Sequence, residues 1–458
     1  MSFSTVNPAT GEFVKEFPLQ SDTQVFAALA TADRRYREDW KHRSVAERTQ
    51  ILARAARILR DKRDEYARYP TLEMGKIVSQ SYGEIELVAD ILDYYANNGE
   101  QFLAPQPLPG EPGATLVAEP IGVILAIEPW NFPYYQLARV AATQLVAGNV
   151  VMMKHAENVP QCALAFARLF EEAGAPEGVY TNLFCSIDQV AKLVDDFRVR
   201  GVALTGSERA GTAVAERAGR NLKKVILELG GSDPAIILED APLDFAVEQC
   251  VMGRTFNSGQ GCVNVKRVIV VGKERGEQML AALTARFAAL KVGDPHDETT
   301  ALGPVVSERA LEGLLKQIAD AKAAGARIVH GGRRVERPGF YLEPTIVTDI
   351  AADNPLYQQE AFGPVLSFYV VNSEEEAREL ANATRFGLGS FVFGADIEHA
   401  KRVASRLEAG MVYINSCFAD SPGLPFGGVK NSGFGRELSE LGIGEFINRK
   451  LVRVAGVA

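Results

Sequence analysis

The most constraining feature of the sequence is a regular alternation of apolar, β-branched runs with longer amphipathic segments between residues 122 and 229. The spacing of apolar residues distinguishes two kinds of segment, strands with a period of two and helices with a period near 3.6. Strands are expected near 122–128, 149–154, 179–184, 201–205 and 224–229, and helices near 134–146, 160–174, 187–196 and 208–219. Such an alternation is typical of a parallel sheet covered by helices. The sequence therefore predicts an α/β fold.

The alternation resumes after Gly231, which predicts a second lobe of the same kind. Its strands are expected near 234–238, 265–271, 365–371, 389–393 and 411–415, and its helices near 277–290, 309–324, 374–383 and 397–407. The first 110 residues read as mainly helical, and the segment 46–68 predicts one amphipathic helix that ends before Pro70. We expect two Rossmann-like parallel-sheet lobes.

Composition excludes several classes of partner. The net charge of −9 gives no electrostatic reason to bind nucleic acid or an anionic membrane. Apolar runs such as 122–127 are too short to span a bilayer, and the N-terminus does not resemble a signal peptide. The five scattered cysteines suit a reducing cytoplasm, and the five scattered histidines predict no metal site.

One thiol and one carboxylate stand in glycine-rich surroundings. Cys262 closes the run Asn-Ser-Gly-Gln-Gly-Cys at 257–262, and Glu228 opens Glu-Leu-Gly-Gly at 228–231. A thiolate can add to an aldehyde carbonyl, and a carboxylate can then activate water against the resulting thioester. The alternative for a single cysteine is a small buried apolar residue.

Together these motifs resemble the aldehyde dehydrogenase superfamily. The resemblance covers the chain from Asn-Pro-Ala-Thr-Gly-Glu at 7–12 to Ser-Gly-Phe-Gly-Arg-Glu at 432–437. It implies NAD(P)-dependent oxidation of an aldehyde to a carboxylic acid through a cysteine thiohemiacetal and thioester, with Cys262 as nucleophile and Glu228 as base. Members that pass the acyl group to coenzyme A typically lack the equivalent acid, so Glu228 favours hydrolysis.

The motif Pro-Trp-Asn-Phe-Pro at 129–133 supplies a candidate for oxyanion stabilisation. The Asn131 amide, with the backbone N–H of Cys262, is placed to receive the oxyanion of the tetrahedral adduct. The alternative for Asn131 is a helix N-cap. By the resemblance, the neighbouring Trp130 belongs to the cofactor site.

No Gly-x-Gly-x-x-Gly fingerprint is present in the first lobe. Instead, Gly206, Ser207 and Gly211 lie where a predicted strand ends and a helix opens, and a helix N-terminus can hold a pyrophosphate. The alternative is a plain helix cap. The spacing resembles the family's Gly-Ser-x-x-x-Gly cofactor motif.

Two further segments enter the predicted cofactor site through the resemblance alone. Gln-Glu-Ala-Phe-Gly-Pro at 359–364 is similar to the family's Glu-x-Phe-Gly-Pro element. By that likeness Glu360 holds the nicotinamide ribose and Phe362 packs by the ring, and Leu229, after the candidate base, also contacts the cofactor.

The nucleotide preference is predicted from Lys154 and Glu157, which follow another strand. Lys154 is expected to reach ribose hydroxyls. Glu157 is expected to accept a hydrogen bond from the adenosine 2′-hydroxyl and to repel a 2′-phosphate, which favours NAD over NADP. The alternative for Glu157 is an exposed acid at a helix start.

Arg139 is the most informative residue for the substrate. It lies in an otherwise apolar helix and is four residues from Tyr135, so both share a face. A guanidinium among apolar neighbours needs an anionic partner, and a substrate carboxylate would serve. The alternative is an internal ion pair. The position also resembles the arginine of short bacterial succinate-semialdehyde dehydrogenases, which implies succinate semialdehyde as substrate.

The chain also departs from that group. Phe256 stands where some members carry a second arginine, and Asp420 stands where related sequences tend to have serine. Ser421 is the alternative hydroxyl for the substrate. A broad-specificity aliphatic or aromatic aldehyde dehydrogenase therefore stays open as an alternative, and a catalytically silent structural protein is a more distant one.

The resemblance also implies a domain organisation. Residues 1–109 and 123–229 are expected to form the NAD-binding domain, and 230–419 the catalytic domain. Residues 110–122 and 437–458 are expected to form a small oligomerisation β element, because pairing protects an edge strand. We expect a homodimer or homotetramer.

Overall fold

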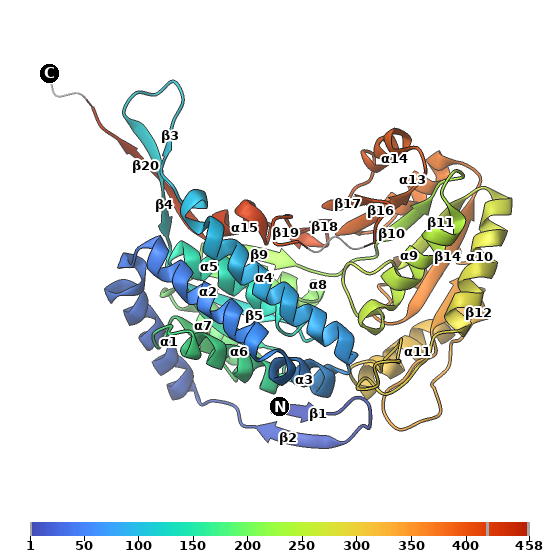
Figure 1. Ribbon diagram of the computed structural model, residues 1–458, viewed down its shortest axis with the longest axis horizontal. Helices are drawn as coiled ribbons and strands as arrows, with labels where there is room; N and C mark the ends of the chain where they lie inside the picture. The colour runs from blue at the N-terminus through green and yellow to red at the C-terminus, as the bar shows by residue number, and fades with distance from the viewer. Residues whose placement is uncertain (1, 418–420, 456–458) are drawn as a thin grey trace.

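The computed structural model describes residues 2–417 and 421–455, in two α/β lobes and a projecting β arm (Figure 1). The sheet of the first lobe has the strand order β19-β9-β8-β5-β6-β7, in which only β19 is antiparallel to its neighbour. Its strands are β5 (Val123–Glu128), β6 (Val150–His155), β7 (Tyr180–Asn182), β8 (Val199–Thr205), β9 (Lys224–Glu228) and β19 (Gly433–Phe434). The alternation predicted from sequence is thus confirmed.

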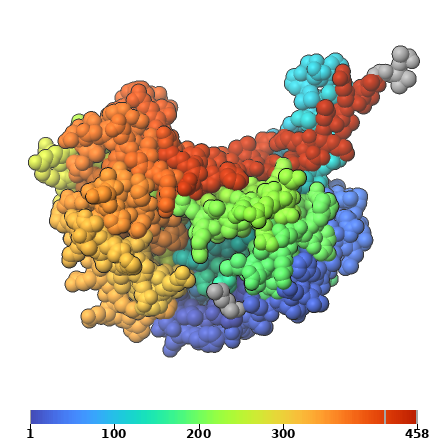
Figure 2. Space-filling view, turned by 180° about the vertical axis from the view of Figure 1, so that it is seen from behind, coloured from blue at the N-terminus to red at the C-terminus, as the bar shows by residue number. Residues whose placement is uncertain are grey.

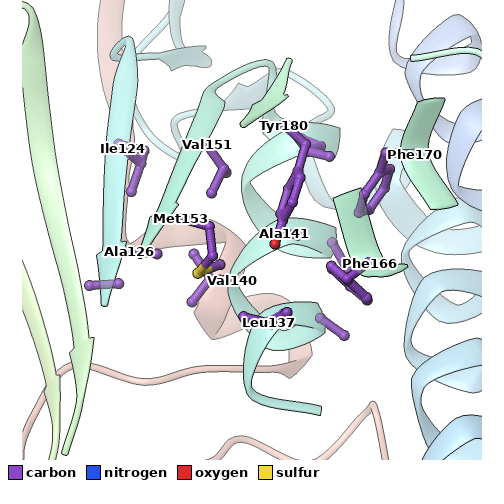
Figure 3. Packing of buried hydrophobic residues seen from close by; sticks show 14 of the residues in the cluster. Ile124, Ala126, Leu137, Val140, Ala141, Val151, Met153, Phe166, Phe170 and Tyr180 are labelled. Carbon is purple, nitrogen blue, oxygen red and sulfur yellow. The ribbon is translucent and has the colours of Figure 1, made fainter. Parts of the chain in front are cut away.

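Helices surround this first sheet. They are α1 (Asp22–Glu38), α2 (Val45–Asp61), α3 (Arg63–Met74), α4 (Val78–Phe102), α5 (Tyr135–Ala147), α6 (Pro160–Glu172), α7 (Ile187–Asp195), α8 (Glu208–Arg220) and α15 (Ser439–Gly444). Figure 3 shows Leu137, Val140 and Ala141 of α5 between the strand residues of the sheet and the aromatic residues Phe166 and Phe170 of α6. This packing fixes the position of α5 between the sheet and α6.

The single helix predicted over 46–68 is wrong. Two helices, α2 and α3, occupy the region, and Pro70 lies inside α3 rather than beyond a helix end. Pro70 and its neighbours Tyr69 and Thr71 are buried. Burial of this helix offsets the backbone hydrogen bond that proline removes.

The second lobe contains a seven-stranded sheet with the order β12-β13-β14-β11-β10-β16-β17. Only the edge pair β12–β13 is antiparallel. Its strands are β10 (Pro234–Ile237), β11 (Arg267–Val271), β12 (Arg327–His330), β13 (Thr345–Thr348), β14 (Val365–Val371), β16 (Gly389–Phe393) and β17 (Met411–Ile414). Its helices are α9 (Leu243–Thr255), α10 (Lys273–Ala288), α11 (Glu308–Ala323), α12 (Pro355–Gln358), α13 (Glu374–Asn382) and α14 (Ile397–Ala404).

The arm is a three-stranded antiparallel sheet of β3 (Gln106–Pro107), β4 (Ala114–Pro120) and β20 (Ile447–Arg453). The C-terminal segment crosses both lobes before it enters the arm (Figure 2). Residues 437–446 do not belong to the arm, because Glu437 is buried, α15 packs against α5, and Phe446 lies in the core of the first lobe. The arm therefore begins later than the predicted boundary at residue 437.

Two small antiparallel pairs complete the fold, the hairpin of β1 (Phe3–Val6) with β2 (Phe13–Phe17) and the pair of β15 (Phe386–Gly387) with β18 (Val429–Lys430). Among the described residues, no helix is both long enough and apolar enough to cross a membrane. Over the same residues, no cluster of three or more metal-ligating side chains is found.

Candidate active site

Cys262 follows a turn with unusual backbone geometry at the end of α9. Asn257, Ser258 and Gly259 all have positive φ, at 53°, 54° and 74°. A Cβ on Gly259 would lie 2.3 Å from the carbonyl of Gly363, so the segment before β14 packs against this turn at a glycine. Backbone strain of this kind persists only where surrounding contacts enforce it, and it clusters at functional sites.

Cys262 opens onto a cavity of about 310 Å³ at the junction of the lobes. Cys262 is partly exposed, whereas the other four cysteines are buried. The cavity brings together most of the residues that the sequence predicted for catalysis and cofactor binding. Its lining consists of Pro129, Trp130, Asn131, Gln136, Thr205, Gly206, Ser207, Leu229, Gly230, Cys262, Glu360 and Phe362.

Burial and the charged groups around Cys262 shift the pKa of its thiol in opposite directions. Enclosure by protein atoms raises its pKa to about 12. The positive charges of Lys266 and Arg139 lower the pKa, and the negative charges of Glu360 and Asp233 raise it further. The thiolate therefore depends on nearby cations.

Asn131 is held by residues of the turn at 257–262, which ends at Cys262 and is called the nucleophile turn below. Its backbone carbonyl accepts from Asn257 Nδ2 at 2.7 Å, and its own Nδ2 donates to the carbonyl of Gln260 at 3.1 Å. The side-chain amide of Gln136 donates to Asn131 Oδ1 at 3.3 Å. The N-cap of α5 is Tyr134, so the N-cap alternative for Asn131 is not what the structure shows. The Asn131 amide NH₂ faces the backbone that leads to Cys262.

Side chains of helix α4 hydrogen-bond both to the start of α5, which follows Asn131, and to the turn that precedes Cys262. Glu84 Oε1 accepts from the backbone N–H groups of Tyr134 and Tyr135, at 2.8 and 2.9 Å, and so satisfies the start of α5. Gln80 Oε1 accepts from the backbone N–H of Asn257 at 2.9 Å. The buried Lys76 pairs with Glu84. One helix thus fixes the segment that carries Asn131 relative to the turn that precedes Cys262.

Of the predicted cofactor residues, all but Gly211 line the cavity or an adjoining hollow of about 360 Å³. The hollow is lined by Lys154 and Glu157, whose side chains pair at 3.2 Å. Ser207 is the N-cap of α8, and its hydroxyl accepts from Ala210 N at 3.3 Å. This is the contact that the helix-cap alternative for Ser207 requires. Gly211 contacts Leu229, since a Cβ there would lie 2.7 Å from a Leu229 methyl carbon.

Glu360 and Phe362 line the cavity wall together with Gly206 and Ser207. Phe362 stands edge-on to Trp130, with ring centroids 5.7 Å apart. Glu360 Oε1 accepts from the backbone N–H of Gly231 at 3.1 Å and pairs with Lys266 at 3.0 Å. The wall is therefore preorganised by contacts within the chain.

Glu228 ends β9 and its carboxylate does not line the cavity. The side chain is buried, and neither oxygen has a hydrogen-bond partner among the described residues. Burial and the neighbouring Glu437 raise its pKa well above the usual value, against the opposing charges of Arg139 and Arg436. A carboxylate with a raised pKa is a stronger base.

The prediction that Arg139 clamps a substrate carboxylate is wrong in this structure. Its side chain is 0% exposed, and Arg139 Nε lies 2.7 Å from Glu437 Oε2. The guanidinium also contacts Gln136 and, at 3.2 Å, Thr205 Oγ1. The anionic partner that an isolated guanidinium needs is thus internal, which is the alternative that the sequence left open.

The other predicted substrate residues are separated. Tyr135 and Phe256 both contact Phe132, with ring centroids 6.1 and 5.9 Å apart, so they belong to an aromatic cluster beside the nucleophile turn. Ser421 is exposed and does not line the cavity. Asp420 lies outside the described residues.

Sequence reasoning missed several residues of the site. Lys266 stands four residues after Cys262, just beyond the motif that drew attention to the thiol. Glu437 closes a motif that was recognised, but its role as a buried partner depends on the fold. Glu84 and Gln80 carried no sequence signal, because their partners are backbone N–H groups remote in the chain.

Comparison with known proteins gives a consistent result. The aldehyde dehydrogenase family model matches residues 1–452. The chain is 49% identical over 452 residues to a protein of Deinococcus radiodurans named succinate-semialdehyde dehydrogenase (NADP(+)), covering 98% of this chain and 94% of that protein. It is 43% identical to a probable succinate-semialdehyde dehydrogenase (NADP(+)) of Synechocystis, covering 99% and 100%. The crystal structure of succinic semialdehyde dehydrogenase from Streptococcus pyogenes in complex with NADP+ matches with a TM-score of 0.97 and 45% identity, covering 99% and 100%.

These findings contradict the predicted preference for NAD. The named relatives carry NADP(+) in their names, and the streptococcal structure contains NADP+. The prediction expected the charge of Glu157 to repel a 2′-phosphate, but its carboxylate is paired with Lys154. An ion pair presents little net negative charge to a ligand. By family model and relatives alike, the chain belongs to the aldehyde dehydrogenase family.

Proposed function

We propose that the protein oxidises succinate semialdehyde to succinate with NADP as hydride acceptor. The observation that carries the proposal is a partly exposed thiol, Cys262, in one cavity with the amide of Asn131, in a chain of the aldehyde dehydrogenase family. The names of relatives at 43% and 49% identity support the substrate and the cofactor.

The proposed chemistry begins at Cys262. Its thiolate adds to the aldehyde carbon, and the oxyanion is received by the Asn131 amide and the backbone N–H of Cys262. One such donor contributes about 3 kcal/mol to lowering the barrier. Loss of hydride leaves an acyl group on the sulfur as a thioester, and attack by water then releases the carboxylic acid.

The residues along the cavity fit a dinucleotide phosphate. The N-terminus of α8 at Ser207 offers backbone N–H groups to a pyrophosphate. Lys154 supplies a positive charge in the adjoining hollow. Glu360 and Phe362 line the same cavity as Cys262 and would hold a nicotinamide, which supplies hydride acceptance when bound.

Glu228 is the proposed base for hydrolysis of the thioester. Burial and the neighbouring Glu437 raise its pKa, which makes its carboxylate a stronger base toward water. The next two residues, Leu229 and Gly230, line the cavity, so the backbone places Glu228 beside it, and the proposal requires its carboxylate to turn toward the thioester. This acid also argues against transfer of the acyl group to coenzyme A.

The test of the proposed function is the initial rate of NADPH formation with succinate semialdehyde, beside acetaldehyde, hexanal and benzaldehyde. We expect the largest kcat/KM for the semialdehyde. No lysine or arginine is among the described residues that line the cavity, which is the observation that favours a broader specificity. Equal or better kcat/KM for the neutral aldehydes would replace the proposed substrate by that broader class.

The charge of Lys154 provides a separate prediction on the cofactor. We expect Lys154→Met to raise the KM for NADP by about tenfold or more, with a smaller effect on the KM for NAD, because a charge-assisted contact to a phosphate contributes about 1.5–3 kcal/mol. Initial rates with each nucleotide measure this. Lys192→Met, which removes an exposed lysine that pairs with Asp22 on the same lobe, is the matched control. Equal effects on the two nucleotides would remove Lys154 from phosphate recognition.

The partner of Lys154 gives the opposite prediction. Glu157→Gln leaves the Lys154 ammonium without its ion pair, so we expect the KM for NADP to fall by a few-fold relative to the KM for NAD. The ratio of kcat/KM values for the two nucleotides is the measurement. A ratio that moves toward NAD would show that Glu157 assists rather than opposes NADP.

A further inference from the structure

Lys266 is a buried lysine directly beneath the nucleophile turn. Its residue is 3% exposed, and Nζ donates to the carbonyl oxygen of Gly261 at 2.8 Å and to the carbonyl oxygen of Cys262. A lysine is rarely buried unless its charge is paired. Both carbonyls belong to the peptide units that flank Cys262, so the ammonium touches the backbone of the nucleophile itself.

The backbone of Lys266 is fixed on both sides. Its N–H donates to the carbonyl of Asp233 at 3.0 Å, and its own carbonyl accepts from Ser367 N at 2.9 Å. The next residue, Arg267, opens β11 in the centre of the second-lobe sheet. The ammonium therefore extends from a rigid strand end, which limits the positions that it can take.

One carboxylate shares the ammonium with the turn. Glu360 Oε1 lies 3.0 Å from Lys266 Nζ and accepts from Gly231 N at 3.1 Å. Glu360 and Cys262 both line the cavity, whereas Lys266 lies behind them. The pair Lys266–Glu360 is thus the charged pair next to the thiol on the second-lobe side.

Four charged groups act on the Cys262 thiol from the elements around it. Lys266 and Arg139 favour the thiolate, and Glu360 and Asp233 oppose it. Arg139 is already paired with Glu437. Asp233 is buried, and its pKa is raised to about 6 by burial, with Lys266 as the main opposing charge. Lys266 is therefore the cation whose charge is divided between the thiol and these two carboxylates.

We propose that Lys266 is a positioning residue that holds the turn around Cys262 and favours the thiolate, and that its pairing with Glu360 sets how strongly it does so. The importance of this for turnover rests on the proposed function, in which Cys262 is the nucleophile. The inference itself concerns the reactivity of one thiol, which is measured without substrate or cofactor.

The experiment is the rate of alkylation of Cys262 by iodoacetamide as a function of pH, in the protein without nucleotide. Peptide mass spectrometry identifies the labelled cysteine among the five. We expect Lys266→Met to move the midpoint of the profile upward by about one pH unit, which makes alkylation near pH 8 about tenfold slower. We expect Glu360→Gln to move the midpoint downward, because the ammonium loses a competing carboxylate.

Lys291→Met is the control, since this exposed lysine pairs with Asp297 away from the turn. The opposite signs of the two shifts separate the proposal from general damage to the fold, which would change both variants in the same direction. Unchanged midpoints in folded variants, or shifts of the same sign, would overturn it. Where Lys266→Met fails to fold, Glu360→Gln decides alone: a downward shift supports the proposal and an unchanged midpoint refutes it.

The two proposals fail independently. Absence of NADPH formation from any aldehyde would refute the proposed function and leave the alkylation profiles interpretable. Normal NADPH formation with unmoved alkylation profiles would refute the role of Lys266 and leave the proposed function standing.

Discussion

Replacement of Cys262 by alanine is expected to reduce NADPH formation by at least about 10⁴-fold, because the variant has no atom that can form the covalent adduct. The fold should be unaffected, since the side chain is partly exposed and lines a cavity. The measurement is the steady-state rate with NADP and succinate semialdehyde, together with a thermal unfolding curve.

The control is Cys250→Ala, which removes a thiol that is fully buried in the core of the second lobe. It should cost some stability and keep most of the activity. Residual activity of Cys262→Ala within tenfold of the original enzyme would show that the reaction does not proceed through this sulfur.

Arg139→Met is expected to lower the free energy of unfolding by about 3–5 kcal/mol, the range measured when one member of a buried ion pair is removed. The change leaves Glu437 without its partner, next to Glu128 and Glu228. Burial already raises the pKa of all three carboxyls, and Arg139 is the cation that acts against this in all three, joined by Arg436 at Glu228. The shift in the midpoint of urea unfolding measures the effect.

The sign of the pH dependence follows from those pKa directions. A carboxyl whose pKa is higher in the folded protein keeps a proton that the unfolded chain loses, so stability falls as pH rises above the unfolded pKa of about 4.3. Removal of Arg139 raises these pKa values further. The deficit of Arg139→Met should therefore be larger near pH 8 than near pH 5. A deficit that grows on acidification would contradict this picture of the cluster.

Arg327→Met is the matched control, because Arg327 pairs with Asp349 at the surface. Exposed pairs of this kind contribute about 0–1 kcal/mol. A stability of Arg139→Met equal to that of this control, combined with a selective rise in the KM for succinate semialdehyde, would return Arg139 to the substrate.

The strands and helices around both sheets were predictable because their signal is local. In β14, β16 and β17 the apolar, β-branched runs lie between turn residues, and the predicted spans agree with the structure within a residue. Helix α9 was not among the predicted helices. Its apolar residues include the exposed Phe245 and Met252 as well as the buried Ala246, Val247, Cys250 and Val251, so no single apolar face stands out at helical spacing.

The candidate site was predictable in part. Cys262, Asn131 and Glu360 come from separate segments, and the resemblance to a family predicts that they belong to one site. The pairing of Arg139 with Glu437 was not predictable, because a guanidinium in an apolar helix specifies only that an anion is present. Whether the anion comes from the chain or from a ligand depends on the tertiary fold. The cofactor prediction failed for a related reason, since the charge of Glu157 was considered without the ammonium of Lys154 beside it.

The most direct test of the central claim is the mass of the Cys262 peptide from Glu228→Gln protein, quenched soon after mixing with NADP and succinate semialdehyde. The account predicts a rapid release of NADPH that stops near one equivalent per active site, with a succinyl group on the Cys262 peptide, because hydrolysis has lost its base. NADPH formation that continues at the full steady rate, or an acyl group on any other peptide, would contradict it.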